Sequence, residues 1–469
     1  MRVAVVGGGV TGLTAALRVA RRSGDAEVTL FDKNAQLGGE ILTERVSGFL
    51  IEAGADSFLT RKPRGIELCE ELGLAGRLIA RRAEHAGAFV KHGGRLHPLP
   101  EGLTGMIPTR VDSLAESTLL SPEGRAAIAH ERTVPAPTDP AEESIAEFVT
   151  RRFGREVYER IVEPLMAGIY GGDGERLSVD ATFPQLKEFE SRFGSVVRGL
   201  EASRKGTAVE DPPPFVSFAD GMGEMIEQLA SRLGGGAIRR GVEVIAVEPR
   251  AGDGFTLVLD AGATMTADAV ILATPASATA RMVQALDRDL SELHAQIEYA
   301  SAVTVSLAFR TRDLPRPVNG YGYVVPRIEG SDVVACTIVS NKWPGRAPAG
   351  YALFRTYFRG RDGRNITGED DDALIRAASR ELESIYGVAA APALVRIKRW
   401  PAALPQYTRG HSDRVARIRN RLRFHPGLFV AGAAYTGVGI PDCIASGEAA
   451  AEAAVALGAG REPSTGRTP

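Results

Sequence analysis

The sequence predicts an α/β fold organised around a Rossmann-like parallel sheet, to which a helical block and a β-rich block are added. A short apolar strand at Val3–Val6 leads into a glycine-rich turn and a helix, and a second strand follows at Glu27–Phe31. Near the other end, a strand at Leu428–Val430 also leads into glycines, followed by a helix at Ala445–Leu457. Because both ends carry the same kind of unit, we expect distant segments to assemble into one domain.

The first half of the chain contains most of the predicted helices, including those of the helical block. Helical patterns occur at Leu13–Arg22 and Arg64–Ala80, and residues 101–210 are mainly helical. Residues 85–99 instead predict a hairpin, because two apolar stretches flank Gly93-Gly94.

The second half supplies most of the strands. Helices are predicted at Gly221–Leu233 and Asp371–Tyr386, and apolar runs or alternation predict strands around them. These strands are expected at 238–248, 255–259, 269–272, 299–310, 321–326, 332–340 and 351–358.

Composition and charge exclude several classes of protein. The 469 residues carry a net charge of -2, so we expect no nucleic-acid partner. The three cysteines match no metal or disulfide spacing, so we expect no metal site and a reducing cytoplasm. No uninterrupted apolar stretch is long enough to span a bilayer, although peripheral contact with a membrane stays open.

The first glycine-rich turn has the spacing of a dinucleotide-binding loop. Gly7, Gly9 and Gly12 form G-x-G-x-x-G between a strand and a helix, and Asp32 ends the next strand. Such glycines allow a tight turn, backbone approach to a pyrophosphate and close packing of helix on strand. The acid would accept hydrogen bonds from ribose hydroxyls. This unit alone leaves both nicotinamide and flavin dinucleotides open.

Further glycine-rich segments resemble those of the amine oxidase superfamily of flavoproteins. They are Leu37–Gly39, Glu52–Ser57 and Gly427–Gly447. The resemblance implies an extended FAD, with a helix N-terminus beside its ring stabilising negative charge on reduced flavin. The residues expected to contact FAD are Gly7, Gly8, Gly9, Val10, Thr11, Gly12, Asp32, Lys33, Gly38, Gly39, Glu40, Gly54, Ala55, Asp56, Ser57, Val244, Trp400, Gly432, Val438, Gly439 and Ile440.

Four segments resemble the FAD-dependent protoporphyrinogen and coproporphyrinogen oxidases, and most closely the Gram-positive coproporphyrinogen III oxidase branch. They read Glu-Ala-Gly-Ala-Asp-Ser-Phe-Leu (52–59), Leu-His-Pro-Leu-Pro (96–100), Glu-Pro-Leu-Met-Ala-Gly-Ile-Tyr-Gly-Gly (163–172) and Gly-Val-Gly-Ile-Pro-Asp-Cys-Ile (437–444). Two positions depart from the family. Glu40 replaces a usual Lys or Arg, and Ala88 replaces an Arg that eukaryotic members carry for a substrate propionate. The second departure favours the coproporphyrinogen branch.

This resemblance implies a six-electron oxidation of coproporphyrinogen III to coproporphyrin III in haem synthesis, with dioxygen as acceptor and hydrogen peroxide as product. Protoporphyrinogen IX is the alternative substrate. Another flavin amine oxidase or desaturase, and a non-catalytic escort protein on the same fold, stay open. FAD itself carries the chemistry, so no catalytic side chain is assigned. Tyr357, Tyr407 and Arg409 are candidates for the substrate site, against ordinary packing for the tyrosines and simple exposure for the arginine.

The resemblance also implies a division into domains. The FAD-binding domain would comprise 1–84, 220–297 and 418–458, the mainly helical domain of membrane-associating type 85–219, the substrate-binding domain 298–417, and a disordered tail 459–469. In the helical block, Phe183, Leu186, Phe189 and Phe193 recur at helical spacing. Core packing is one explanation, and contact with a membrane surface or with ferrochelatase is the other.

Overall fold

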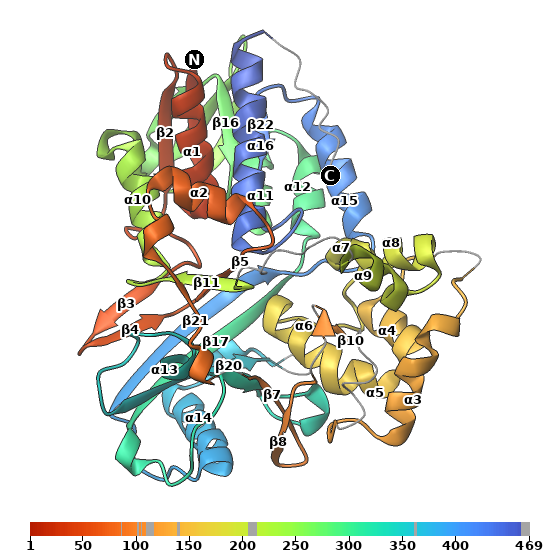
Figure 1. Cartoon of the computed structure of the whole chain (residues 1–469). Coiled ribbons are helices and arrows are strands. Elements are labelled where there is room, and N and C mark those ends of the chain that lie inside the picture. The colour runs from red at the N-terminus through yellow and green to blue at the C-terminus, as the bar shows by residue number, and fades with distance from the viewer. Residues whose placement is uncertain are drawn as a thin grey trace.

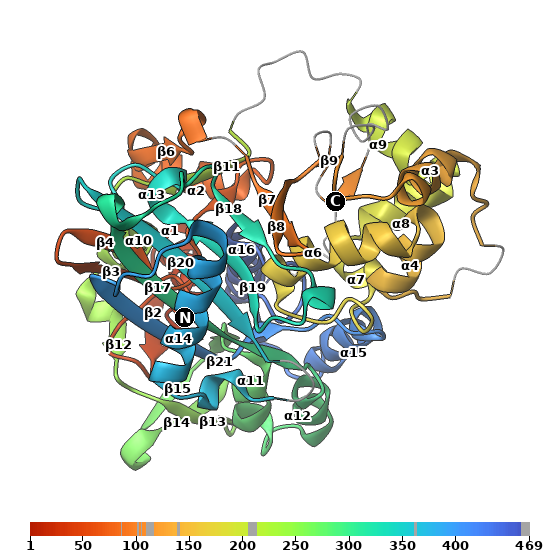
Figure 2. The same ribbon diagram turned by 90° about the horizontal axis from the view of Figure 1, so that it is seen from below.

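The computed structural model describes residues 1–85, 87–100, 103–104, 106–108, 117–137, 141–204, 213–360 and 364–460. Most of the predicted tail at 459–469 lies outside these residues. Figure 1 shows a parallel sheet with helices in the upper part, a β-rich part below it, and a group of helices to one side. Figure 2, seen from below, shows the same helical group beside the β-rich part. The predicted fold class is confirmed.

The central sheet is assembled from both ends of the chain. Its five strands have the order β12-β2-β1-β16-β22, and every neighbouring pair is parallel. The strands are β1 (Arg2–Val6), β2 (Glu27–Asp32), β12 (Ile238–Arg240), β16 (Ala269–Leu272) and β22 (Leu428–Val430). This arrangement confirms the predicted convergence of distant segments.

The two faces of this sheet are covered differently. Val3 and Val5 of β1 belong to a core shared with helices, whereas Ala4 and Val6 belong to a core under a second sheet. This alternation follows from the twofold period of a strand. The covering helices are α1 (Val10–Arg22), α2 (Arg64–Leu72), α10 (Gly223–Leu233) and α16 (Ile440–Gly458). The other face packs on β13 (Val244–Pro249), β14 (Phe255–Leu259), β15 (Thr264–Ala267), α11 (Ala276–Val283) and α12 (Arg288–Ala295).

A larger sheet forms the β-rich part, in the order β21-β17-β20-β19-β18-β7-β8. Its strands are β17 (Tyr299–Arg310), β18 (Gly322–Val324), β19 (Val333–Ile338), β20 (Tyr351–Arg359) and β21 (Leu394–Pro405), joined by β7 (Phe89–His92) and β8 (Arg95–Pro98). The helices α13 (Val339–Lys342) and α14 (Asp371–Tyr386) accompany it. The predicted hairpin therefore extends this sheet through the parallel pairing of β7 with β18, and the predicted placement of residues 85–99 in the helical domain is wrong.

The long strand β21 was not predicted. Arg396, Lys398 and Arg399 interrupt its apolar pattern, and most of its residues are only partly buried. The strand forms because it pairs with β17 along nearly its whole length. Tertiary pairing thus outweighs a weak local signal.

The helical group has its own core. It contains α3 (Pro122–His130), α4 (Ile145–Phe153), α5 (Arg155–Val157), α6 (Glu163–Tyr170), α7 (Val179–Thr182), α8 (Pro184–Phe193) and α9 (Val196–Arg204). Leu186 is buried in that core, and Phe183 and Phe189 pack against it, so the aromatic spacing on α8 serves core packing. Among the described residues, no helix is long and apolar enough to cross a membrane.

The remaining elements join these parts. Small sheets are formed by β3 (Thr43–Val46) with β4 (Phe49–Glu52), by β11 (Phe215–Phe218) with β5 (Phe58–Leu59) and β6 (Leu78–Ala80), and by β9 (Leu103–Thr104) with β10 (Ile107–Pro108). Helix α15 (His411–Leu422) precedes β22. Several of these segments, with the start of β17, border the site described next.

Candidate cofactor and substrate site

The first glycine loop contains glycines of two kinds. Two of them have neighbours so close that a side chain would not fit, and one faces open space. Gly7 has a φ of 111°, and a Cβ on Gly12 would lie 1.8 Å from the carbonyl oxygen of Gly7. A Cβ on Gly9 would meet nothing closer than the Gly38 carbonyl oxygen, at 4.0 Å. Gly9 is also the N-cap of α1, and no side chain caps that helix end. Bare N–H groups therefore border open space, which suits an anion such as a pyrophosphate.

A second glycine loop lies directly against the first. The Gly38 N–H donates to the Gly8 carbonyl at 2.9 Å, and Gly9 and Gly38 form an isolated bridge. A Cβ on Gly39 would find only the Gly9 Cα, at 3.7 Å. The two loops thus form one continuous backbone wall with room beside it.

Asp32 holds the first loop in place. Its Oδ2 accepts a hydrogen bond from the Gly8 N–H at 2.7 Å, and its Oδ1 accepts one from the Asn34 N–H at 2.7 Å. A carboxylate oxygen can accept more than one hydrogen bond, so ribose hydroxyls can still be bound here. The Val242 N–H donates to the Asp32 carbonyl at 3.0 Å, which brings the start of β13, at Val244, to the same edge. Lys33 is exposed beside this edge.

The C-terminal glycine segment meets the N-terminal one. Gly432 has a φ of 116°, and a Cβ there would lie 3.7 Å from the Thr11 Oγ1. A Cβ on Gly447 of α16 would lie 2.4 Å from the Thr11 carbonyl oxygen, so α1 and α16 cross closely. At the start of α16, the Gly439 N–H donates to Asp442, Ile440 is buried, and Val438 packs against the helical group. The two glycine-rich ends are therefore in contact.

Glu40 directly follows the second glycine loop. Its side chain keeps solvent-exposed surface, although protein atoms crowd around its carboxyl group. Burial raises the pKa of Glu40 to about 7. Its charge acts on Tyr299 at the start of β17 and on Cys443 in the first turn of α16. Glu40, Tyr299 and Cys443 therefore lie near one another beside the glycine loops.

Glu40 predicts a pH-dependent affinity for the dinucleotide. Ionisation of Glu40 near pH 7 places a negative charge beside an anionic ligand, so FAD should bind more weakly at pH 8 than at pH 6. We expect Glu40→Gln to bind FAD about tenfold more tightly than wild type at pH 8 and to lose most of this pH dependence. Equilibrium titration of apoprotein with FAD measures both effects. The control is Glu44→Gln, since Glu44 pairs with Arg396 at the surface. Equal affinities of wild type and Glu40→Gln at pH 8 would contradict the prediction.

The ionisation of Glu40 also changes the stability of the folded apoprotein. Because the pKa of Glu40 is raised, the folded state holds this proton more tightly than the unfolded chain does. Stability therefore falls as pH rises from the ordinary carboxyl range toward 7, in the same direction as the FAD affinity.

Asp56 lies in a cluster of charged side chains. Its carboxylate accepts hydrogen bonds from Lys342 at 2.9 and 3.0 Å and lies 3.2 Å from Arg355. Ser57 and Trp343 also donate to it. Burial would raise the pKa of Asp56, but Lys342 and Arg355 outweigh burial and lower it far below its ordinary value. This carboxylate therefore joins the loop after Ala55 to the larger sheet.

Trp400 stands against the same loop. Its Nε1–H donates to the Ala53 carbonyl at 3.0 Å, and the Thr304 hydroxyl donates to the same oxygen at 3.1 Å. A Cβ on Gly54 would lie 1.9 Å from the Glu40 carbonyl oxygen and 3.4 Å from the Trp400 ring. Gly54 is thus required where the loop passes between Glu40 and the indole.

The three substrate candidates lie in different surroundings. Tyr357 on β20 is partly exposed, with its hydroxyl 3.3 Å from the Thr337 Oγ1 and its ring under the Arg355 guanidinium. Tyr407 is buried, donates to the Ala433 carbonyl at 2.6 Å and stacks on His411. Arg409 is at the surface and pairs with Glu147 of the helical group. Arg409 therefore already pairs with a carboxylate of the protein itself.

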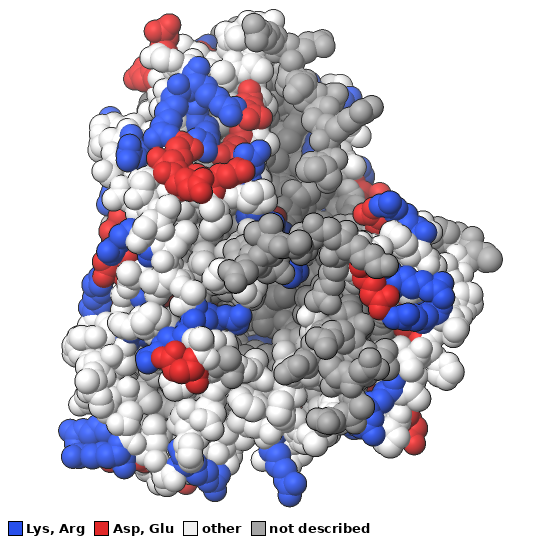
Figure 3. Space-filling model, viewed as in Figure 1, with Lys and Arg blue, Asp and Glu red and all other residues white. Residues whose placement is uncertain are grey.

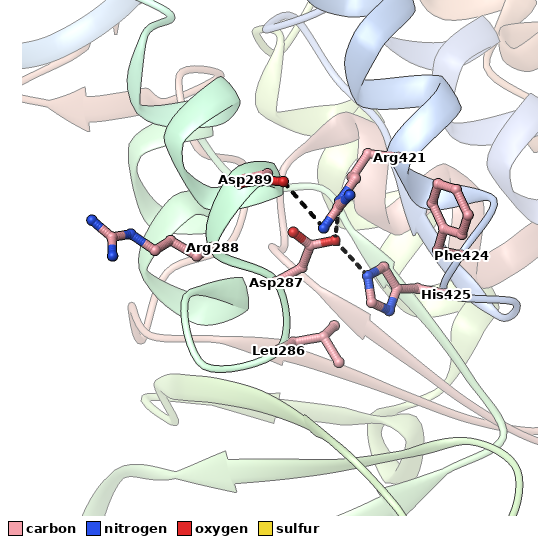
Figure 4. A pocket seen from close by; sticks show the side chains of 7 residues that line it. All are labelled: Leu286, Asp287, Arg288, Asp289, Arg421, Phe424 and His425. Carbon is pink, nitrogen blue, oxygen red and sulfur yellow. Dashed lines mark hydrogen bonds and ion pairs between the residues drawn. The ribbon is translucent and has the colours of Figure 1, made fainter.

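A separate pocket of about 430 Å³ lies between α12 and α15. Figure 4 shows Asp287 pointing toward Arg421 and His425, while Arg288 points away. Asp287 accepts from Arg421 at 2.6 Å, from His425 at 2.7 Å and from the N–H of Leu290 at 3.0 Å. These contacts lower the pKa of Asp287 to about 2 against the effect of burial. The carboxylate joins two helices and is already fully engaged.

Fold and glycine loops together define a Rossmann-type flavoprotein. The model of the family described as flavin containing amine oxidoreductase matches residues 10–455. The chain belongs to this family and is an FAD-dependent oxidoreductase. Within the family, it is 32% identical to a coproporphyrinogen III oxidase of Bacillus subtilis (strain 168) over 460 residues, which cover 96% of both chains.

Two further comparisons place the chain among porphyrinogen oxidases. A chloroplastic protoporphyrinogen oxidase of Oryza sativa subsp. japonica is 27% identical over 469 residues, covering 94% of this chain and 85% of the other. A crystal structure from Exiguobacterium sp. 255-15, provisionally named a protoporphyrinogen oxidase, has a TM-score of 0.84 and 34% identity, covering 97% of this chain and 99% of that one.

The chain's own geometry fits FAD. Gly9 and Gly39 leave room beside bare backbone, and the uncapped start of α1 attracts an anion. Sequence reasoning did not assign roles to Lys342 or Arg355, which complete the charged cluster around Asp56. One signal was available, because Arg355 lies inside a mostly apolar strand, where a charge needs a partner.

Proposed function

We propose that this protein oxidises coproporphyrinogen III to coproporphyrin III, removing six electrons and six protons from the macrocycle. The observation that carries the proposal is the near full-length similarity to a coproporphyrinogen III oxidase, combined with a dinucleotide cradle formed by both ends of the chain. The chloroplastic protoporphyrinogen oxidase is 27% identical, against 32% for the coproporphyrinogen III oxidase of Bacillus subtilis, and this difference supports coproporphyrinogen over protoporphyrinogen IX.

In this proposal, each part of FAD is assigned to a group of residues beside the glycine loops. Gly7, Gly8, Gly9, Val10, Thr11 and Gly12 would hold the pyrophosphate, Asp32 and Lys33 the ribose, and Val244 the adenine. The flavin end would meet Gly38, Gly39, Glu40, Gly54, Ala55, Ser57, Trp400, Gly432, Val438, Gly439 and Ile440, with Asp56 acting through the loop that it anchors. When bound, FAD supplies two-electron oxidation and transfers those electrons to dioxygen, which gives hydrogen peroxide.

The protein's own task is to orient a flat macrocycle and to exclude water. The macrocycle would lie beside Trp400, near the glycine loops, the start of β17 and the start of α16, which Trp400 and Glu40 connect. Tyr357 is the candidate wall residue that retains exposed surface. Tyr407 would act indirectly, because its hydroxyl holds the Ala433 carbonyl in the flavin-side turn.

Purified protein tests the proposal directly. It should carry FAD absorption and convert coproporphyrinogen III to a fluorescent porphyrin, with one dioxygen consumed and one hydrogen peroxide formed per electron pair. Protoporphyrinogen IX and a primary amine should be oxidised more slowly. Faster turnover of protoporphyrinogen IX or of the amine would reject the proposed substrate. A colourless protein that binds no added FAD would point to an escort-type binding protein.

The proposed cellular setting is the cytoplasm, with transient contact with ferrochelatase or with a membrane surface. The helical group is the part that would make such contacts. Of the four predicted apolar residues, Leu186 is buried in its core, whereas Phe183, Phe189 and Phe193 keep exposed surface.

A further inference from the structure

Arg81 is a half-buried cation held by aromatic rings. It follows β6, and its guanidinium lies 4.9 Å from the centroid of the Tyr321 ring and 5.5 Å from that of Phe215. Within the described part of the chain, no carboxylate pairs with Arg81. Its neighbour Arg82, by contrast, binds Glu84 at 2.8 Å. Cation–π contacts orient the guanidinium without occupying its N–H groups.

Arg81 adds a third positive charge to the cluster around Asp56. The Arg82 N–H donates to the Lys342 carbonyl at 3.1 Å, so this segment lies beside Lys342. Burial lowers the pKa of Lys342, and the charges of Arg355 and Arg81 lower it further, while Asp56 opposes them. Three cations thus lie around Asp56, and Glu52 also acts on one of them, Arg355.

A second carboxylate, Glu52, acts on Arg355, but a fourth cation, Arg346, lies beside Glu52 and keeps the excess of positive charge. The nearby Glu52 is matched by Arg346, whose Nη2 lies 3.8 Å from its Oε1, and Glu52 also accepts hydrogen bonds from Thr43 and the Met222 N–H. In the space-filling view, Lys and Arg side chains border the hollow between the parts of the molecule (Figure 3). The cluster therefore keeps an excess of positive charge beside the substrate candidate Tyr357, whose ring lies under the Arg355 guanidinium.

We propose that Arg81, supported by Lys342, binds a carboxylate of the substrate. A planar guanidinium with free N–H groups matches a carboxylate through two parallel hydrogen bonds. Lys342 is held by Asp56 and contributes charge, whereas Arg81 supplies the free donors. The inference rests on the proposed function and extends it, since coproporphyrinogen III carries four propionates.

Steady-state kinetics of Arg81→Gln with coproporphyrinogen III test this subsite. We expect KM to rise at least about tenfold, with kcat within about twofold of wild type and unchanged FAD content, because binding is lost but the chemistry is not. The dissociation constant of the product coproporphyrin III, measured by fluorescence, should rise by a similar factor. Arg81→Lys keeps the charge and should recover part of the loss. Arg82→Gln is the matched control and should behave as wild type.

The outcomes separate the two levels of the proposal. An unchanged KM and product affinity in Arg81→Gln, with wild-type turnover intact, overturns the Arg81 subsite alone. An equal rise in KM for Arg82→Gln also overturns it, because the loss of any nearby positive charge would then explain the effect. A wild-type protein that binds FAD but oxidises no porphyrinogen overturns the proposed function and the subsite together.

Discussion

Gly12→Ala is expected to destabilise the apoprotein by about 3 kcal/mol or more and to abolish FAD binding. The added methyl would lie 1.8 Å from the Gly7 carbonyl oxygen, so helix α1 must move away from β1. The obstructing atom is backbone in a loop that Asp32 anchors, and no flexible side chain can give way. Chemical denaturation of the apoprotein and FAD titration measure the two effects.

Gly9→Ala is the matched control for that experiment. Gly9 has a φ of -75°, which alanine adopts readily, and its Cβ would enter open space. We therefore expect apoprotein stability within about 1 kcal/mol of wild type, but FAD affinity reduced about 100-fold, because the methyl keeps the pyrophosphate from the backbone N–H groups. If Gly9→Ala unfolds as easily as Gly12→Ala, the two glycines do not have separate roles.

Asp56→Asn is expected to lower the free energy of unfolding by about 3 to 5 kcal/mol at pH 7. The substitution keeps the shape of the side chain but leaves Lys342 and Arg355 without their counterion in a buried cluster. Arg355 cannot turn to solvent, because its guanidinium also donates to the Gly54 carbonyl at 2.9 Å and to the Glu52 carbonyl. Denaturant unfolding of both proteins measures the difference.

The pH dependence of that difference provides a second test. Because the pKa of Asp56 is lowered in the folded state, its stabilising contribution is present above the pKa of an unfolded aspartate and is lost as pH falls through the folded value. Wild type and Asp56→Asn should therefore converge in strong acid. Asp220→Asn is the control, since Asp220 pairs with Arg45 and Arg77 at the exposed surface and should cost about 1 kcal/mol or less. A similar loss for both variants would contradict the argument.

The elements that sequence reasoning located best are those with strong local signals. The strands 255–259, 269–272, 299–310 and 428–430 and the helix Asp371–Tyr386 have the predicted bounds. In the site, the prediction of Gly7, Gly9 and Gly12 as turn, approach and packing positions matches the space around each of them. Such roles are encoded within a few residues, so no distant contact is needed to infer them.

Other features depend on contacts that no local pattern reports. The strand β21 exists through its pairing with β17, and the hairpin of β7 and β8 joins a sheet whose other strands lie far along the chain. Arg409 was considered for a propionate, but the fold places Glu147 beside it. Asp56 was expected at the cofactor, and the fold surrounds it with Lys342, Arg355 and Trp343.

By itself, the sequence determined that a glycine-rich parallel sheet built from both ends of the chain binds a dinucleotide, and its motifs pointed to FAD and a porphyrinogen. Local backbone chemistry is sufficient for that, because glycine spacing and strand length are properties of adjacent residues. Only the tertiary structure decided which charges face one another. It paired Asp56 with Lys342 and Arg355, and it left Arg81 between two rings without a carboxylate, because ion pairing depends on distances across the fold.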